Sequence, residues 1–248
     1  MPDRSTSEPD SKTKPARSHT ARVVDHLGLA IVAGRMAEGS LLPGDVELLD
    51  RFGVSRTVLR EALKTLAAKG MVQARARVGT RVRPRSAWNL FDTDLLMWHV
   101  EAGLTPEFFA HLAEIRMVLE PEAAAFAALR RTKEDMVEIN GWADRMDEKG
   151  IGREAFAQAD LGFHLAVARA ANNPFFISIS TLIEVVLVAM LTRSSPADEP
   201  DRLEASVVQH RRIAKAIADG NPNDARAVMR EVIENGLDNA RLFDPDLA

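Results

Sequence analysis

The sequence predicts a mainly helical protein in two parts: an N-terminal module of three helices and one β-hairpin, followed by an all-helical antiparallel bundle. Two observations support a division into two parts. Residues 1–86 carry a formal charge of +7 and residues 87–248 carry −11, and long periodic helices with little strand signal fill the chain after Pro84. Halves of opposite charge suggest two domains with different partners.

The most informative segment is a basic helix early in the chain. Ser55 is placed to cap it, and its apolar residues recur at three- and four-residue spacing. Arg56, Arg60 and Lys64 stand four apart, so they form one row on the opposite face. Positions 51–85 hold ten Lys and Arg against one acid. Such a row repels itself unless a polyanion lies against it, which favours a DNA-binding helix over an ordinary solvated face.

The elements around this helix complete a winged helix-turn-helix. Helices are expected over 21–34 and from the LLPGD turn at 41–45 to Phe52, and Gly70 supplies the left-handed residue that ends the third helix. The hairpin is expected to have strands at 71–77 and 80–83, a turn at Gly79, and positive charge from Arg75, Arg77 and Arg81. In such modules the third helix enters the major groove and the wing touches the backbone or minor groove. The residues expected to meet double-stranded DNA are Arg51, Ser55, Arg56, Thr57, Arg60, Lys64, Arg75, Arg77, Gly79 and Thr80.

Composition sets the domain limits and excludes several classes of protein. Residues 1–19 are polar and predict a disordered arm. The winged domain is expected over 20–85, a linker with a first helix over 86–104, and a second, helical domain over 105–248. The chain has no cysteine, which excludes disulfides and thiolate metal sites. No apolar run reaches the roughly 20 residues of a transmembrane helix, so we expect a cytoplasmic protein with no membrane partner.

About seven helices are expected after Pro84. Their starts and stops are clear: a cap at Thr105, a capping box of Thr132 with Asp135, and Pro222 at the first position of the last helix. The expected ranges are 91–101, 106–131, 132–150, 153–171, 174–193, 203–219 and from 221 onward. This pattern predicts the helical bundle.

Three residues of the bundle have the chemistry of metal ligands. Asp160 and His164 stand four apart on one expected helix and project from the same face. His210 lies on another helix, on the stripe of inward-facing Ile213 and Ile217. Together they could hold zinc, nickel, manganese or iron and leave positions open for water or a ligand's oxygen atoms. The same spacing also occurs in surface pairs and in structural core histidines, so spacing alone leaves both interpretations open.

Several segments of the chain together match one family: LPGDVELLDRFGVSRTVLREALKTLAAKGMV, the wing GTRV, EIRMVLEPEAAAFAA, DLGFHLAVARAANNP and HRRIAKAIADGNPNDARAVM. In these segments the chain resembles the GntR superfamily of bacterial transcription regulators, in its FadR-type branch with the all-helical FCD effector domain. The segment WNLFDTDLLMW at 88–98 further resembles the sugar-acid branch, such as galactonate-responsive repressors.

The resemblance implies a homodimer that reads a palindromic operator and binds a small carboxylate effector near a divalent metal ion. It maps the metal ligands onto Asp160, His164 and His210, with zinc expected before nickel or manganese. Two positions depart from the family. Val232 stands where many relatives have a further histidine ligand, which implies weaker metal binding, a site completed by water or effector, or an unoccupied site. Val46 replaces a frequent arginine, which removes one possible DNA contact.

Arg116 is the candidate for gripping the effector carboxylate, because a guanidinium can make a bidentate pair. Its alternative role is an intrahelical pair with Glu120, four residues on. The resulting hypothesis is a transcriptional repressor that effector binding releases from its operator, with no catalytic residues. The alternatives are a metal-responsive repressor without an organic effector and, ranked far lower, a non-heme metal enzyme using the same three ligands.

Overall fold

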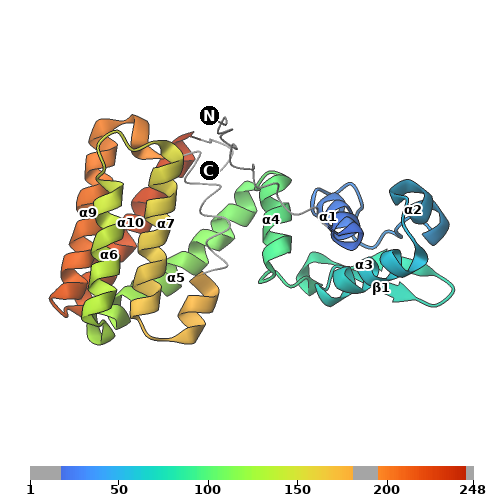
Figure 1. The fold of residues 1–248 in the computed structure, drawn as a ribbon, viewed down its shortest axis with the longest axis horizontal. Helices are drawn as coiled ribbons and strands as arrows, with labels where there is room; N and C mark the ends of the chain where they lie inside the picture. The colour runs from blue at the N-terminus through green and yellow to red at the C-terminus, as the bar shows by residue number, and fades with distance from the viewer. Residues whose placement is uncertain (1–17, 181–194, 244–248) are drawn as a thin grey trace, which may run out of the picture. The chain divides into compact units, whose positions relative to one another are not determined.

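The computed structural model describes residues 18–180 and 195–243 of the chain. It separates into two compact units, Met1–Trp88 and Asn89–Ala248 (Figure 1). Residues 1–17 of the expected arm lie outside the described residues, whereas Ser18 caps the first helix and His19 begins it.

The first unit is a winged helix-turn-helix, which confirms the predicted fold class. Its core joins Leu27 of the first helix, Leu48 of the second, and Leu59 and Leu66 of the third, all at most 2% exposed. The two strands pair antiparallel with Val72 opposite Val82. The elements are α1 (His19–Val32), α2 (Asp45–Phe52), α3 (Arg56–Ala68), β1 (Val72–Arg75), β2 (Gly79–Val82) and the short 3-10 helix η1 (Arg85–Ala87).

The ends of α3 are fixed by local chemistry. The Ser55 hydroxyl accepts a hydrogen bond from the Val58 amide at 3.3 Å, as expected of a helix cap. Gly70 follows the helix with φ of 79°, and a Cβ built there would lie 2.2 Å from the carbonyl oxygen of Ala87. Position 70 therefore needs glycine twice over, for its left-handed backbone and for the close approach of segment 85–87.

The hairpin differs from its predicted form. β1 ends at Arg75, and Arg77 has φ of 61°, a left-handed conformation that no strand can contain. Gly79 therefore begins the return strand instead of forming the middle of the turn. The guanidinium of Arg81 in β2 donates a hydrogen bond to the carbonyl of Gly39.

The second unit is the predicted helical bundle. Its helices are α4 (Thr93–Glu101), α5 (Pro106–Arg130), α6 (Lys133–Met146), α7 (Arg153–Ala170), α9 (Pro200–Ala218) and α10 (Pro222–Phe243), with the 3-10 helix η2 (Pro196–Asp198) before α9. The capping box of Thr132 and Asp135 is present. α9 begins at Pro200, earlier than the expected residue 203. Of the helix expected over 174–193, residues 174–180 are helical and 181–193 lie outside the described residues.

α7 packs against α5 and α6 in the described bundle. Its alanines at 157, 159, 166 and 170 are buried, and Phe156 and Phe163 are at most 1% exposed. A Cβ at Gly162 would lie 2.5 Å from the ring of Trp142, so a glycine allows α6 to approach. Asp160 and His164 therefore project from the most enclosed helix among those described.

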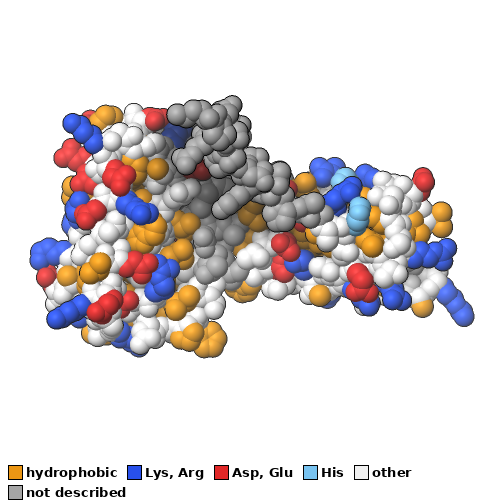
Figure 2. Space-filling view, viewed as in Figure 1, with side chains coloured by type: hydrophobic (Ala, Val, Ile, Leu, Met, Phe, Trp, Pro, Cys, Tyr) orange, Lys and Arg blue, Asp and Glu red, His pale blue; other side chains and the backbone are white. Residues whose placement is uncertain are grey.

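The outer faces of the bundle are charged. Figure 2 shows Lys and Arg side chains beside Asp and Glu over its visible face, and the ion pairs include Arg211 with Asp144 at 3.0 Å and with Asp147 at 2.8 Å. Among the described helices, none combines the length and apolarity needed to cross a bilayer.

Candidate DNA-binding face and metal site

A groove of about 680 Å³ is lined by α2, the exposed side of α3 and the wing. Five of the residues expected to meet DNA line it: Arg56, Thr57, Arg60, Lys64 and Thr80. Within residues 18–180 and 195–243, Arg56 and Arg60 form no hydrogen bond or ion pair, so their charge faces solvent. The structure thus brings the basic row of α3 and the wing to a common surface.

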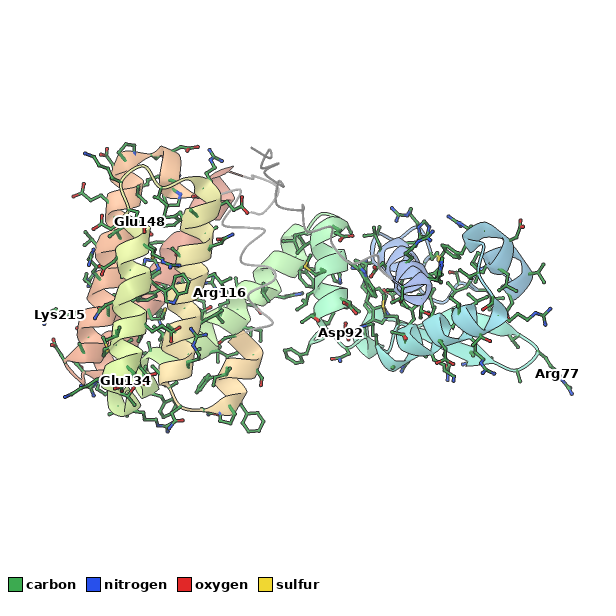
Figure 3. All side chains as sticks on the ribbon, viewed as in Figure 1. Arg77, Asp92, Arg116, Glu134, Glu148 and Lys215 are labelled. Atoms are coloured by element: carbon green, nitrogen blue, oxygen red, sulfur yellow. The ribbon has the colours of Figure 1, made fainter. Side chains whose placement is uncertain are left out.

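The wing extends this basic surface. Arg75 and Arg77 are exposed, and Figure 3 shows Arg77 at the tip of the hairpin with its side chain pointing away from the domain. Gly79 lies at the start of β2, directly after the tip. A positively charged hairpin tip of this kind can reach a phosphate or a minor groove.

Three of the expected DNA contacts have partners inside the protein. Arg51 lies 3.3 Å from the ring nitrogen Nε2 of His26 on α1. Burial and the neighbouring Arg51 lower the pKa of His26. Ser55 uses its side chain as the helix cap, and Lys64 forms an exposed ion pair with Glu61 at 3.0 Å. The exposed Lys64–Glu61 pair is weak enough for DNA phosphates to compete with it.

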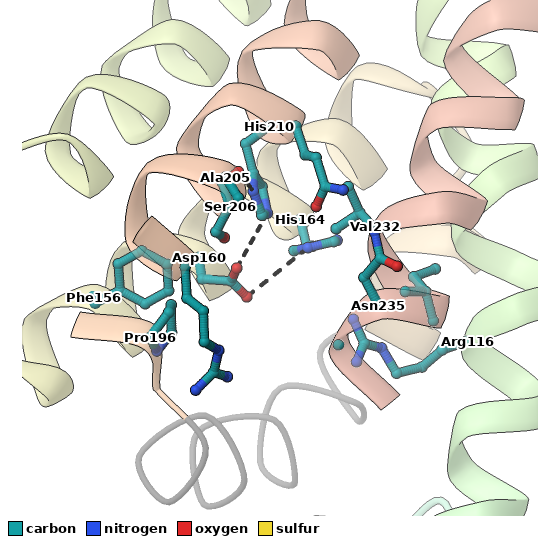
Figure 4. Close-up of a pocket in the computed structure, with 14 residues that line it drawn as sticks. Arg116, Phe156, Asp160, His164, Pro196, Ala205, Ser206, His210, Val232 and Asn235 are labelled. Atoms are coloured by element: carbon teal, nitrogen blue, oxygen red, sulfur yellow. Dashed lines mark hydrogen bonds and ion pairs between the residues drawn. The ribbon is translucent and has the colours of Figure 1, made fainter. Parts of the chain in front are cut away.

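The three candidate metal ligands meet in the bundle. Asp160 and His164 lie one turn apart on α7, and His210 faces them from α9 (Figure 4). One carboxylate oxygen of Asp160 is 3.1 Å from His210 Nε2, and the other is 3.9 Å from His164 Nε2. Ligand atoms of all three residues lie within 4.8 Å of one another, and all three side chains are buried.

The hydrogen bonds of His210 indicate that a cation fits between these groups. Its Nδ1 lies 2.8 Å from the carbonyl oxygen of Ser206, so Nδ1–H donates there and Nε2 faces the site. Nε2 lies 3.1 Å from a carboxylate oxygen of Asp160 and is buried without a well-directed hydrogen bond. A proton or a metal ion between these two atoms would satisfy both of them. A two-histidine, one-carboxylate donor set suits a divalent transition metal.

Glu120 on α5 contacts the Nδ1 side of the His164 ring. Its Oε2 is 2.7 Å from His164 Nδ1, although the ring N–H does not point directly at the oxygen. Its Oε1 accepts from Arg116 Nε at 2.6 Å. Burial alone would raise the pKa of Glu120, but Arg116 and His164 together lower it to about 2.

The electrostatics of the metal-free cluster favour ionised partners. Burial acts to lower the pKa of His164, but Glu120 and Asp160 raise it overall. Burial acts to raise the pKa of Asp160, but His210 and His164 lower it overall. The cluster therefore holds its carboxylates charged and ready to bind a cation.

A cavity of about 320 Å³ opens beside the three ligands. Arg116 lines it, so this side chain both pairs with Glu120 and faces the cavity (Figure 4). Val232 also lines it, with 8% of its surface exposed, and offers no ligand atom. The remaining polar lining residues were not anticipated from the sequence: Arg202, Ser206, Gln209 and Asn235.

The residues that sequence reasoning missed had weak signals or none. Ser206 stands one helical turn before His210, so helical spacing could have suggested it. Gln209 is adjacent to His210, and adjacent residues do not share a helix face, so spacing gave no signal for it. Glu120 was weighed only as a partner of Arg116. Its contact with His164 depends on how α5 packs against α7, which spacing within one helix cannot reveal.

The two units together define a class of protein: a winged helix-turn-helix module joined to a helical domain that has a cavity beside a buried Asp and His group. Residues 19–82 match the family described as bacterial regulatory proteins, gntR family, and residues 111–235 match the FCD domain. The chain belongs to the GntR family of bacterial transcriptional regulators and carries an FCD domain. It is a regulator and not an enzyme.

Its relatives include repressors. The chain is 34% identical over 198 residues to the galactonate operon transcriptional repressor of Escherichia coli K12, covering 80% of this chain and 86% of that protein. It is 29% identical over 215 residues to the transcriptional repressor NanR of Klebsiella aerogenes, covering 82% and 78%. The solved structure of Lar, described as controlling the Listeria monocytogenes agr system, aligns over 93% of this chain and 100% of its own, with a TM-score of 0.62 and 20% identity. That likeness concerns the fold alone.

Proposed function

We propose that this protein is a homodimeric transcriptional repressor that a small carboxylate effector, of the sugar-acid kind, releases from its operator. The observation that carries the proposal is the buried group Asp160, His164 and His210 beside a cavity lined by Arg116. A DNA-binding domain in the same chain gives such a cavity a clear use, because a ligand bound there can shift the population of DNA-competent arrangements.

We assign a separate function to each part of the chain. Residues 20–85 bind DNA, 86–104 form the linker and first helix, and 105–248 bind the effector and dimerise. The DNA contacts are assigned to the exposed residues of α3 and the wing, with Arg56 and Arg60 as the base-reading candidates and Arg75 and Arg77 as phosphate or minor-groove contacts.

The cation would be held by Asp160, His164 and His210, with zinc first and nickel or manganese as alternatives. When bound, it supplies positive charge and open coordination positions for an effector's oxygen atoms. Val232 adds no fourth ligand from α10, so the affinity should be lower than in a four-ligand site. His210 is held for this role by its hydrogen bond to the Ser206 carbonyl.

The chemistry of the cavity supports a hydroxylated acid as effector. Arg116 and Arg202 bring two guanidinium groups to its wall. Ser206, Gln209 and Asn235 add neutral groups that can hydrogen-bond hydroxyls. The volume lies at the lower end of the range for small-molecule sites. A sugar acid presents a carboxylate and several hydroxyls, and galactonate is the first candidate because it appears in the name of a relative.

The test measures operator binding by fluorescence anisotropy, using duplex fragments that flank the protein's own coding region. D-galactonate and a panel of other sugar acids and dicarboxylates are added with and without a chelator. An Arg116→Lys variant should bind DNA normally and lose most of the response to acid. Arg211→Lys is the matched control, since Arg211 lies on α9 but pairs outward with Asp144 and Asp147.

Two outcomes would change the proposal. If metal alone altered operator affinity and no acid added to the effect, the protein would be a metal-responsive repressor without an organic effector; the buried ligand group favours this second candidate. If neither metal nor acid altered binding to any bound fragment, the cavity would have no regulatory role.

A further inference from the structure

Glu120 is a buried carboxylate with two partners on different sides. Its side chain is 10% exposed, and its two oxygens contact Arg116 and His164. Arg116 Nε lies 2.6 Å from Oε1 and Nη2 lies 3.4 Å from Oε2, while His164 Nδ1 lies 2.7 Å from that same Oε2. A single carboxylate is thus shared between a cavity-lining guanidinium and a candidate metal ligand.

Glu120 and Asp160 lie at different ring nitrogens of His164. The Nδ1 edge of His164 faces Glu120, and Nε2 is the ring nitrogen nearer to Asp160. A carboxylate at Nδ1 fixes the ring orientation and makes Nε2 a stronger donor to a cation. Arg116 draws on the same negative charge, because its guanidinium is also held by Glu120 and faces the cavity.

We propose that Glu120 is a positioning residue that couples the cation site to the carboxylate-binding site by sharing its charge between His164 and Arg116. This inference rests on the proposed function and extends it. When a ligand carboxylate binds the guanidinium of Arg116, Arg116 offsets less of the negative charge of Glu120. More of that charge then acts on His164, and the cation binds more tightly. The coupling is reciprocal, so a bound cation also strengthens carboxylate binding at Arg116.

The experiment titrates the full-length protein with Co²⁺ alone at fixed pH, and reads both affinity and the visible d–d absorption band of the bound ion. Glu120→Gln keeps the shape of the side chain and removes its charge, so the Co²⁺ affinity should fall by about 10- to 100-fold. Arg116→Gln removes the competitor for that charge and a positive charge near the site. Its Co²⁺ affinity should rise by about 5-fold or more.

Glu122→Gln is the matched control. Glu122 lies two residues along α5 and also pairs with an arginine, Arg226, at 2.6 and 3.0 Å. It does not line the cavity. Its loss should leave both the Co²⁺ affinity and the absorption band unchanged.

The opposite signs of the two variants separate coupling from a merely structural role. If Arg116→Gln weakened Co²⁺ binding as Glu120→Gln does, the pair would only hold the fold, and the inference would be overturned. Equal affinity in wild type and Glu120→Gln would overturn it as well. Thermal unfolding of the metal-free variants checks the fold, and Arg116→Gln alone carries the test if Glu120→Gln does not fold. Failure of the wild type to bind Co²⁺ would instead remove the cation from the proposed function.

Discussion

Replacement of Gly70 by alanine should destabilise the DNA-binding unit far more than an ordinary glycine replacement. Gly70 has φ of 79°, and the left-handed conformation costs an L-residue roughly 1–2 kcal/mol. A Cβ there would also lie 2.2 Å from the Ala87 carbonyl oxygen, a backbone atom that cannot rotate away. Overpacking of this kind adds about 1–3 kcal/mol. The expected loss is therefore about 2–5 kcal/mol, a large share of a stability of roughly 5–15 kcal/mol.

Gly34→Ala provides the control, since Gly34 has φ of 73° and no atom within 4 Å of the added Cβ. It should show the backbone cost alone. Hydrogen–deuterium exchange of the full-length protein, followed in peptides from α3 and β1 for Gly70→Ala and in α1 for Gly34→Ala, measures the free energy of local opening in each case. Equal losses in the two variants would refute the reasoning that segment 85–87 presses on the end of α3.

Three further predictions concern DNA binding and pH. Arg56→Ala should cost about 1–3 kcal/mol in operator affinity and relax specificity at one base pair, as measured by anisotropy on operator variants; an equal loss on random DNA would leave only a phosphate contact. Arg75→Ala should reduce the slope of log affinity against log salt by about 1, and an unchanged slope would exclude a phosphate contact. The pKa of Glu120 is about 2 in the metal-free fold against the ordinary 4.5, so the ionised carboxylate stabilises the folded state above pH 4.5. This contribution to the free energy of unfolding, up to about 3 kcal/mol, is lost as the pH falls toward 2. The free energy of unfolding of metal-free Glu120→Gln, measured with urea, should lack this fall between pH 4.5 and 2. The same pH dependence in wild type and variant would contradict the prediction.

Local sequence signals located the helices well because their ends depend on neighbouring residues. Thr132 and Asp135 form the expected capping box, and Ser55 caps α3, since both motifs involve residues three positions apart. The hairpin was less well placed. A strand pattern could not show that Arg77 would adopt a left-handed conformation, because the turn depends on how the two strands meet.

The candidate site was partly visible in the sequence for the same reason. Asp160 and His164 share one helix, so their common face followed from spacing. The approach of His210 from α9 and of Glu120 from α5 depends on the packing of separate helices. The inward-facing stripe of α9 made His210 a candidate, and the family resemblance placed it beside Asp160 and His164. Arg116 was expected either to grip a carboxylate or to pair with Glu120. The structure contains the pair and also places Arg116 on the cavity wall, so the carboxylate-binding role stays a prediction.

The central claim is that effector binding in the bundle weakens operator binding by the DNA-binding face, and that operator binding weakens effector binding in return. The most direct measurement is a thermodynamic cycle in which operator affinity is determined with and without D-galactonate, and D-galactonate affinity with and without operator, all in the presence of metal. The account predicts that each ligand weakens the other by the same factor, typically 5- to 150-fold. Tight binding of both ligands at once, with no change in either affinity, would contradict it.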